Sequence, residues 1–566
     1  MQKKWTLSDY NKGKAKQIAQ ELAVPEVLGV LLSQRNINTF DEAKNFFRPH
    51  LKDLHDPFLM KGMSAAVNRV KSALSENEKI LIYGDYDVDG TCSVAMVFQF
   101  LSQLTNEIEY YIPDRYKEGY GLSDIGVDYA IGNNFGLVIT LDCGIKSVEK
   151  ISRAKESGVD FIICDHHMPG PELPPAVAVL DPKQSDCNYP YDALCGCGVG
   201  FKLMQALSKE LKLDPENLHS YLDLVALAIA ADIVPITGEN RILCYHGLKE
   251  INNNPRVGIS VMFPANEQKE IRINELVFTL APRINAAGRI RSGKFAVQLL
   301  IQEMEAEAKL VFDEIDKDNT YRRELDQNIT NEALSFLEDL PGNINQKSTV
   351  VYNENWHKGV VGIVASRLIE KHFRPTVVLT RSGETATGSA RSVPGFDLYQ
   401  ALDSCSEHLI QFGGHMYAAG MTLEIDKIDS FKKAFEQIVS KTILDEQLIP
   451  EIKIDLAIAF NELSQKLYRI IQQMAPFGPG NREPVLYSEN VKDAGYSKKV
   501  GKEGKHLKLN MMQEDGTRID GIAFNFGDLY DEIKEGRLFN IVYYLQENVW
   551  NGRTSLQLMI KDIKLL

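Results

Sequence analysis

The sequence contains no long apolar run and no paired cysteine motif, and both absences restrict the class of protein. No segment approaches the roughly 20 apolar residues that cross a bilayer, and the N-terminus MQKKWTLSDYNKGKAKQ lacks the apolar stretch of a secretory signal. The 8 cysteines are scattered, with Cys195 and Cys197 the one close pair, so neither a zinc site of CxxC type nor a disulfide framework is indicated. We expect a cytoplasmic protein with no membrane contact and with reduced, mostly buried thiols.

An excess of positive charge is also missing. The net charge is −14, whereas affinity for a nucleic-acid backbone comes from Lys and Arg side chains that neutralise phosphates. Residues 451–566 hold 16 Lys and Arg against 16 Asp and Glu, so the negative excess lies in the first 450 residues. Any contact with nucleic acid must therefore be local.

The chain of 566 residues exceeds a single hydrophobic core, and its patterns change along its length. Apolar runs at 79–84, 137–141, 160–164 and 176–180 alternate with amphipathic segments, which predicts a parallel α/β sheet. Residues 300–338 contain no Pro or Gly and predict a long connecting helix. A second, smaller α/β pattern follows, and the spaced β-runs beyond about residue 480 predict a small all-β barrel.

These patterns divide the chain into five parts. We assign them as an N-terminal helical extension, a first α/β domain, a helical connector, a second α/β domain and a barrel, at residues 1–60, 61–255, 256–340, 341–450 and 451–566.

The most informative motif is an acidic cluster that follows the first apolar run. Asp85, Asp87 and Asp89 alternate along the chain and precede Gly90. Hard divalent cations prefer oxygen ligands, and such a cluster is unfavourable without one. A calcium-binding EF-hand loop also begins D-x-D-x-D-G, but it needs a preceding helix and a Glu where this sequence has Met96. A solvated acidic turn is the simpler alternative.

Further possible metal ligands follow other apolar runs. Asp165, His166 and His167 end one run, Asp142 ends another, and Asp232 follows an apolar helix-like segment. A carboxylate beside an imidazole suits Mn²⁺ or a similar ion, and adjacent histidines on an extended chain point in opposite directions. Asp142 and Asp232 taken singly are as consistent with caps or turns. Together the groups could hold two ions about 4 Å apart, which predicts phosphoester hydrolysis.

In this order, DYDVDG, LDCG, DHH and ADIVP resemble the DHH phosphoesterase superfamily, and DYDVDG is similar to the first motif of its RecJ family. Further segments similar to RecJ motifs are IPDRYKEGYGL (112–122), PRINAAGR (282–289), GSARS (388–392) and FGGHMYAAG (412–420). The resemblance implies a DHH domain, a DHHA1-type domain and an OB-like barrel, with two Mn²⁺ or Mg²⁺ ions. It implies a metal site formed by Asp85, Asp87, Asp89, Asp142, His166 and Asp232. Which of the first three are direct ligands stays open, and His167 would face the scissile phosphate.

Two motifs in the second α/β domain have the chemistry of a phosphate grip. Ser389 and Arg391 combine a hydroxyl and a guanidinium in a glycine-containing turn, and the resemblance implies that they bind a 5′-phosphate. His415 stands in a glycine-rich and alanine-rich segment that a nucleotide backbone could approach closely. A tight glycine turn packed on a helix is the alternative there.

Basic residues elsewhere could contact the strand. Arg115, Arg283 and Arg289 are expected in Pro-rich or Gly-rich loops, as phosphate clamps or as ordinary surface ion pairs. In the barrel, Tyr496 and His506 could stack on bases. Beside them is a lysine cluster, equally well explained as a solvated hairpin, formed by Lys498, Lys499, Lys502, Lys505 and Lys508.

The resemblance implies a monomeric exonuclease that degrades single-stranded DNA from its 5′ end to mononucleotides, in repair and recombination. Expected partners are single-stranded DNA, a single-strand-binding protein and a helicase. Two alternatives stay open. One is a nanoRNase or cyclic-dinucleotide phosphodiesterase of the same superfamily; the other is a non-catalytic RecJ-like scaffold that binds single strands.

Overall fold

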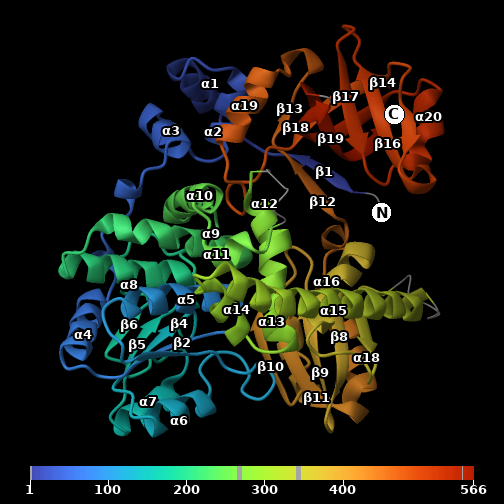
Figure 1. Ribbon diagram of the computed structural model, residues 1–566. Helices are drawn as coiled ribbons and strands as arrows, with labels where there is room; N and C mark the ends of the chain where they lie inside the picture. The colour runs from blue at the N-terminus through green and yellow to red at the C-terminus, as the bar shows by residue number, and fades with distance from the viewer. Residues whose placement is uncertain (1–2, 264–269, 339–345, 551) are drawn as a thin grey trace.

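The first lobe is built on the apolar runs that end in acidic residues. The computed structural model describes residues 3–263, 270–338, 346–550 and 552–566 (Figure 1). Within them, these runs lie in a five-stranded sheet whose neighbouring strands are all parallel. Across the sheet, the strands are β3 (Ile108–Tyr111), β2 (Ile80–Gly84), β4 (Leu137–Leu141), β5 (Asp160–Cys164) and β6 (Ala178–Leu180). The apolar pattern misses β3 because IEYY is a partly exposed edge strand.

Helices cover both faces of this sheet. One face carries α4 (Met63–Ser75), α5 (Val88–Ser102) and α8 (Gly196–Glu210). The other face carries α6 (Asp124–Gly132) and α7 (Val148–Glu156). Successive residues of β2 point to opposite faces, so Ile80 and Ile82 join the first core and Leu81 and Tyr83 the second. The strands are thus buried on both sides, as parallel strands require.

A helical region connects this lobe to the next. In chain order, it contains α9 (Leu222–Ala231), α10 (Gly238–Asn253), α11 (Val257–Ser260), α12 (Ile273–Glu275), a π-helical turn (Leu276–Leu280), α13 (Ala281–Ile290), α14 (Lys294–Leu300) and α15 (Glu305–Glu338). Helix α15 has 34 residues and runs across the molecule to the second lobe (Figure 1). The predicted long helix therefore exists, although it begins at Glu305. Leu300, where the prediction began, is the last residue of α14, and residues 301–304 are not helical.

The second lobe is a smaller α/β domain. Its sheet has the strand order β10 (Gln411–His415), β11 (Ala418–Glu424), β9 (Thr385–Arg391), β8 (Thr376–Ser382) and β7 (Thr349–Tyr352). Only the β7–β8 pair is parallel among these neighbours. One face packs against α15 and α16 (Val361–His372). The opposite face packs against α17 (Leu398–Asp403) and α18 (Ile428–Thr442).

The C-terminal region forms a closed barrel. Its elements are β13 (Leu456–Ala457), α19 (Gln465–Gln473), β14 (Leu486–Asp493), β15 (Lys498–Val500), β16 (His506–Met512), β17 (Arg518–Ala523), α20 (Tyr530–Lys534), β18 (Phe539–Trp550) and β19 (Arg553–Leu565). Strand β14 pairs with both β18 and β16, which closes the sheet on itself. The predicted fold class, two α/β domains joined by a long helix plus a barrel, is confirmed.

The N-terminal segment packs with the barrel, although it precedes the first lobe in the chain. It consists of β1 (Lys4–Leu7), α1 (Lys12–Glu21), α2 (Glu26–Ser33) and α3 (Phe40–Phe47). Strand β1 pairs in parallel with β12 (Glu451–Ile454), and α2 shares a hydrophobic core with the barrel. The sequence predicted a purely helical segment, and that prediction is wrong for residues 4–7. These residues form a strand because they pair with β12, more than 400 residues away in the sequence.

Most of the thiols are buried, as the sequence predicted. All 8 cysteines are free, and all except Cys187 are buried. No helix among the described residues is both long and apolar enough to span a bilayer.

Candidate metal centre and substrate cleft

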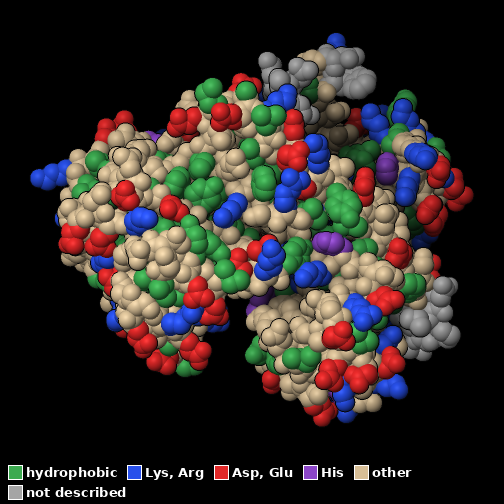
Figure 2. Space-filling view, turned by 60° about the horizontal axis from the view of Figure 1, so that its bottom comes forward, with side chains coloured by type: hydrophobic (Ala, Val, Ile, Leu, Met, Phe, Trp, Pro, Cys, Tyr) green, Lys and Arg blue, Asp and Glu red, His purple; other side chains and the backbone are tan. Residues whose placement is uncertain are grey.

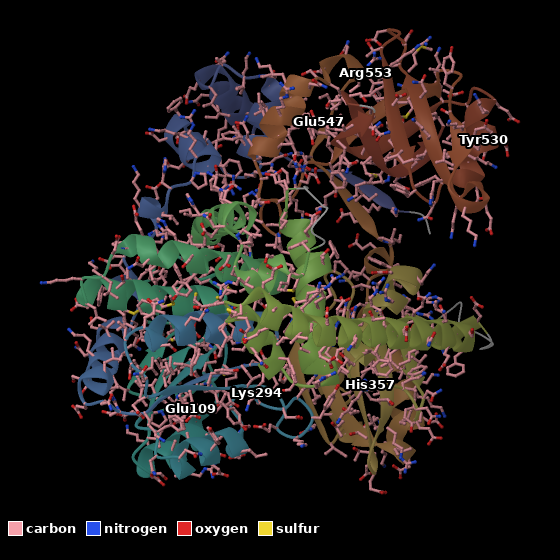
Figure 3. All side chains as sticks on the ribbon, in the orientation of Figure 1. Glu109, Lys294, His357, Tyr530, Glu547 and Arg553 are labelled. Atoms are coloured by element: carbon pink, nitrogen blue, oxygen red, sulfur yellow. The ribbon has the colours of Figure 1, made fainter. Side chains whose placement is uncertain are left out.

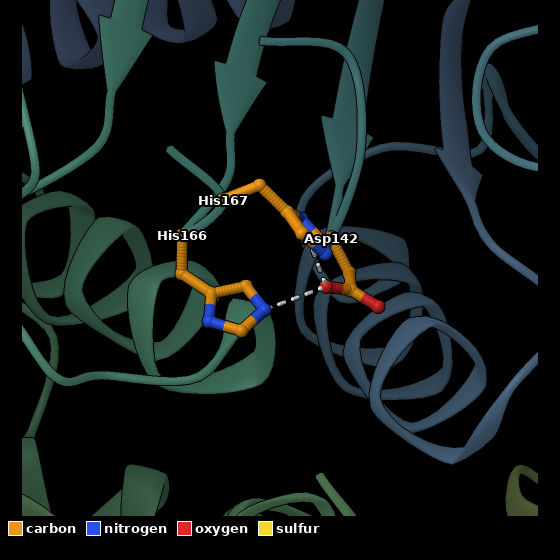
Figure 4. A group of neighbouring side chains, drawn as sticks. All are labelled: Asp142, His166 and His167. Atoms are coloured by element: carbon orange, nitrogen blue, oxygen red, sulfur yellow. Dashed lines mark ion pairs between the residues drawn. The ribbon is translucent and has the colours of Figure 1, made fainter. Parts of the chain in front are cut away.

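The carboxyl edge of the first sheet gathers the predicted metal-site residues. Asp85 follows β2, Asp142 follows β4, and Asp165 and His166 follow β5. Because these parallel strands are neighbours, their ends open at one edge of the sheet. Asp142 has a φ of 59°, in the left-handed region, where the chain turns out of its strand. Figure 4 shows its carboxylate directed at the His166 imidazole.

The starts of two helices hold the other carboxylates of the DYDVDG motif. The Asp87 carboxylate caps α5 by accepting a hydrogen bond from the Gly90 N–H at 3.0 Å. The Asp89 carboxylate is buried and accepts hydrogen bonds from the N–H groups of Gly196 and Cys197 at the start of α8, both at 2.7 Å. Helix N-termini stabilise negative charge, so α5 and α8 partly offset the repulsion between these groups.

His166 lies at the centre of the cluster. Its Nε2 atom is 3.2 Å from Asp142 Oδ1, 3.6 Å from Asp232 Oδ2 and 3.8 Å from Asp89 Oδ2. Asp232 reaches the cluster from the C-terminal end of α9. Four residues that are far apart in the sequence therefore present ligand atoms to one small volume.

The crowding changes the acidity of these groups. Burial, followed by the charges of Asp89 and Asp87, raises the pKa of Asp142 well above its usual range. Burial, then the charge of Asp87, raises the pKa of Asp89 to about 7, and burial with the nearby carboxylates raises that of Asp232 to about 8. Burial lowers the pKa of His166 to about 3, which keeps the imidazole neutral and able to bind a cation.

Several polar atoms of the cluster have no hydrogen-bond partner among the described residues. They include Asp85 Oδ2, Asp142 Oδ1 and Nε2 of His166. Buried polar atoms are normally paired, so these atoms fit a site for cations. Oxygen ligands suit Mg²⁺, and a mixture of oxygen and imidazole nitrogen suits Mn²⁺.

Two overlapping groups bring their ligand atoms within 4.8 Å of one another. They are Asp142, His166 and His167, and Asp89, His166 and Asp232. Asp85 and Asp87 belong to neither group. Their roles as ligands therefore stay predictions.

Asp165 anchors the two histidines. Its carboxylate accepts hydrogen bonds from the N–H groups of Ile145, His166 and His167, and it lies 2.8 Å from His167 Nδ1. Burial opposes its ionisation, but the bond to His167 and the backbone donors bring its pKa down to about 2. Asp165 therefore carries a negative charge that orients His167.

The two histidines do not point in opposite directions, and that prediction is wrong. Their ring centroids are 4.6 Å apart, because the chain bends at His167 instead of continuing as an extended strand. They differ in exposure: 8% of the His166 side chain is accessible, against 41% for His167. His166 faces the carboxylates, and His167 is the more exposed of the two.

The second lobe presents Ser389 and Arg391 on one face of β9, in a strand paired on both sides and not in a turn as predicted. Arg391 Nη1 donates a hydrogen bond to Ser389 Oγ at 2.7 Å. The start of α16 lies directly over them, since a Cβ atom added to Gly362 would be 2.9 Å from Arg391 Nη2 and 3.1 Å from Ser389 Oγ. A guanidinium, a hydroxyl and a helix N-terminus therefore converge, which suits an anionic phosphate.

Two of the three other predicted arginines face this grip. The Arg115 guanidinium packs over the Tyr86 ring, 4.8 Å from its centroid. Burial, followed by the charges of Arg115, Arg322 and Arg391, lowers the pKa of Arg289 to about 10. These guanidinium groups repel one another, and an anion bound among them would relieve that repulsion.

Arg283 has a different environment. Its Nε atom lies 3.0 Å from Asp316 Oδ1 of α15, which is the ion pair that the sequence left open as an alternative. Both Arg283 and Arg289 lie in α13, not in loops as predicted. The proline of PRINAAGR, Pro282, stands where α13 continues from the π-helical turn.

The β10–β11 hairpin extends the face that carries Arg391. Ala418 is the cross-strand partner of both Arg391 and His415, so these side chains share one face of the sheet. His415 and Gly413 are exposed, and a Cβ atom added to Gly413 would meet nothing within 4 Å. The glycine-rich segment is thus an open strand beside the grip, rather than a turn packed on a helix.

Residues near the cleft were also missed by the sequence analysis. Tyr120 Oη lies 3.3 Å from His167 Nε2, and the Lys183 ammonium donates to the His166 carbonyl. Arg322 of α15 adds positive charge near Arg289. Lys183 follows β6 by three residues, so the strand-end pattern could have found it. Arg322 carried no signal, because it stands within an ordinary charged helix.

The predicted lysine cluster of the barrel divides in two. Lys498 and Lys508 are cross-strand partners on β15 and β16. Lys499 instead approaches Asp531, with 3.9 Å between Nζ and Oδ2. Nearby, Tyr496 is 75% exposed and Phe524 is 47% exposed. Exposed aromatic rings beside lysines suit a flexible, stacked single strand.

Known protein families match the three domains of this chain. Family models match in three places: the DHH family N-terminal domain at residues 79–229, the DHHA1 domain at 345–441 and the RecJ OB domain at 454–562. The chain is 38% identical over 565 residues to the single-stranded-DNA-specific exonuclease RecJ of Bacillus subtilis, covering 99% of this chain and 70% of that protein. The chain belongs to the RecJ family. The RecJ of Dickeya dadantii is 34% identical, with 96% of each chain covered.

Solved structures of RecJ show the same architecture. The structure of Thermus thermophilus RecJ in complex with Mn²⁺ matches with a TM-score of 0.86 at 26% identity, covering 99% of this chain and 79% of that one. A structure of exonuclease RecJ bound to manganese matches with a TM-score of 0.60 at 31% identity, covering 70% of this chain and 98% of that one.

Proposed function

We propose that this protein is a metal-dependent exonuclease that removes 5′-mononucleotides from the 5′ end of single-stranded DNA, in DNA repair and recombination. The observation that supports it most is the pairing of two sites across one cleft. A buried cluster of carboxylates and imidazoles on the first lobe faces a phosphate grip on the second. Figure 2 shows the notch between these lobes.

The residues of each lobe have separate tasks in this proposal. Asp89, Asp142, His166 and Asp232 hold two Mn²⁺ or Mg²⁺ ions, which supply water activation and charge stabilisation for phosphoester hydrolysis. His167, oriented by Asp165, contacts the scissile phosphate. The Asp87 and Asp89 carboxylates are held in place before any substrate arrives, by the starts of α5 and α8 respectively.

The polarity of cutting follows from the grip. Ser389 and Arg391 bind a terminal 5′-phosphate, which a strand presents only at one end. Contacts with phosphates carry no sequence information, so cutting is insensitive to base sequence. The exposed lysines and rings of the barrel bind the strand further from its end. We extend the proposal to a monomer in the cytoplasm that works with a single-strand-binding protein and a helicase.

Oligonucleotides labelled at either end test the proposal. With Mn²⁺, a 5′-labelled single strand should release labelled mononucleotide at once, whereas a 3′-labelled strand should shorten gradually and a blunt duplex should remain intact. A series of strand lengths separates this activity from that of a dinucleotide phosphodiesterase, which would act on the shortest alone. Release of 3′ label first, or equal cutting of the duplex, would contradict the proposal.

A further inference from the structure

The two lobes meet at a contact formed by Tyr116, Arg289, His357 and Gly359, here called the interlobe contact. Tyr116, in the turn after β3, donates its hydroxyl to the carbonyl of Arg289. Arg289 Nη1 in turn donates to the Gly359 carbonyl at 2.9 Å. His357, labelled in Figure 3, accepts a hydrogen bond from the Gly359 N–H at 3.1 Å. Its ring is edge-on to Tyr116, with centroids 6.3 Å apart.

Gly359 permits this close approach. A Cβ atom added there would lie 2.5 Å from Tyr116 Oη, 3.0 Å from Arg289 O and 3.0 Å from His357 Cε1. The distance to Tyr116 Oη is far below an ordinary van der Waals contact, and the distance to Arg289 O involves a backbone atom. The neighbours of Gly359 would therefore have to move. The first and second lobes are therefore as close here as a backbone without a side chain allows.

Each side of the interlobe contact leads to one half of the cleft. On the side of the first lobe, the residue before Arg289 in α13 is Gly288, where an added Cβ atom would be 2.7 Å from the carbonyl of Tyr86 in the DYDVDG motif. On the second lobe, Gly362 lies one turn from Gly359 and touches the Arg391 guanidinium. Close glycine contacts thus connect the carboxylate cluster to the phosphate grip.

We propose that the interlobe contact is a positioning device that sets the number of nucleotides removed in each cut. This inference rests on the proposed function. When the 5′-phosphate is held by Ser389 and Arg391, the distance from that grip to the carboxylate cluster determines which phosphodiester bond is cut. A rigid spacing selects the first bond, whereas a loosened spacing allows a second or third bond to reach the cluster.

The test compares product lengths from variants of the contact with those from matched controls. Gly359→Ala forces the lobes apart, and Tyr116→Phe removes one hydrogen bond without adding volume. Gly132→Ala is the first control, since a Cβ atom there meets nothing within 4 Å. Tyr129→Phe is the second, since its hydroxyl binds Glu109 on an exposed surface. The substrate is a 5′-phosphorylated single strand with a label on its first nucleotide.

Wild-type protein and both controls should release labelled mononucleotide alone. Gly359→Ala should release di- and trinucleotides as well, and its rate preference for a 5′-phosphate over a 5′-hydroxyl end should fall by about tenfold, since small displacements of a bound substrate have large effects on rate. Tyr116→Phe should change both in the same direction by a smaller factor. In EDTA, where no cutting occurs, both variants should retain the wild-type binding preference for the 5′-phosphate.

The failures of the two proposals can be told apart. If the wild-type protein releases no nucleotide from single strands, the proposed function is wrong. If it does, but both variants release mononucleotide alone while their rates fall, the contact has a structural role and the positioning inference is overturned. Tyr116→Phe decides the question if Gly359→Ala does not fold.

Discussion

The surroundings of one residue, His166, explain why the cluster requires a cation. The side chain is buried, its Nε2 atom has no hydrogen-bond partner among the described residues, and carboxylate oxygens from three segments lie within 3.8 Å of that atom. The motif DHH identified these ligand types from the sequence. It could not show how the rings are directed, because that depends on the bend after β5 and on the hydrogen bonds of Asp165.

The raised acidity constants predict how stability depends on pH when no metal is bound. The folded-state pKa values of Asp89 and Asp232 are about 7 and about 8, above those of unfolded carboxyl groups. Between the unfolded-state and the folded-state pKa values, the folded state binds more protons than the unfolded state. The free energy of unfolding therefore falls as pH rises through that range. In EDTA, the melting temperature should drop by roughly 5 °C from about pH 6.5 to pH 9.

Saturating Mn²⁺ should remove or reverse that trend, since cation binding requires ionised carboxylates. Asp232→Asn supplies the comparison in EDTA, because it cannot take up the proton and should weaken the pH dependence. A metal-free wild-type protein that becomes more stable between these pH values would contradict the electrostatic description of the cluster.

Arg391 and Arg283 offer a matched pair of substitutions. Arg391→Ala removes a guanidinium from the phosphate grip and should reduce the affinity for a 5′-phosphorylated strand, relative to a 5′-hydroxyl strand, by about 2 kcal/mol or roughly 30-fold. Arg283→Ala removes the ion pair with Asp316 and should leave that ratio unchanged. Fluorescence anisotropy in EDTA measures both. An equal effect of the two substitutions would remove Arg391 from the grip.

At the scale of secondary structure elements, the start of α8 holds the centre of the site in place. A Cβ atom added to Gly196 would be 2.6 Å from Asp142 Cβ and 2.8 Å from its Cα. Gly196→Ala should therefore lower the free energy of unfolding by about 2 kcal/mol through overpacking and weaken Mn²⁺ binding. Gly132→Ala in α6, where the space is open, should be neutral or slightly stabilising. Denaturant titrations that rank the two variants equally would contradict this.

The sequence predicted elements well where a pattern repeats within one segment. Four apolar runs followed by acidic residues identified β2, β4, β5 and β6 and the edge where ligands gather. The edge strand β3 and the helical positions of Arg283 and Arg289 were missed. Those depend on tertiary packing, which a local pattern of apolar, proline and glycine residues does not record.

At the scale of the whole molecule, the largest difference from expectation is the place of the N-terminal segment. It packs on the barrel through the β1–β12 pair and a shared core. Trp5 Nε1 donates a hydrogen bond to Asp562 at 2.8 Å. A single sequence carries no local pattern that indicates which strands pair when they lie so far apart along the chain. The two α/β domains and the barrel, in contrast, follow from patterns within each segment.

The barrel should contribute to binding through charge. Replacing Lys498 and Lys508 with glutamine should reduce the slope of the logarithm of affinity for single-stranded DNA against the logarithm of salt concentration by about 1.4, if each lysine contacts one phosphate. Lys499→Gln should change it less, because that ammonium approaches Asp531. An unchanged slope in the double variant would place the strand elsewhere.

In the proposed function, carboxylates and imidazoles from separate segments of the first lobe bind a pair of divalent cations. Titration of the metal-free protein with Mn²⁺, followed by electron paramagnetic resonance, measures this directly. We expect two ions for each wild-type chain, with magnetic coupling between them, and loss of that coupling in Asp142→Asn. A wild-type protein that binds no Mn²⁺ at this site, or an Asp142→Asn variant with unchanged binding and coupling, would contradict it.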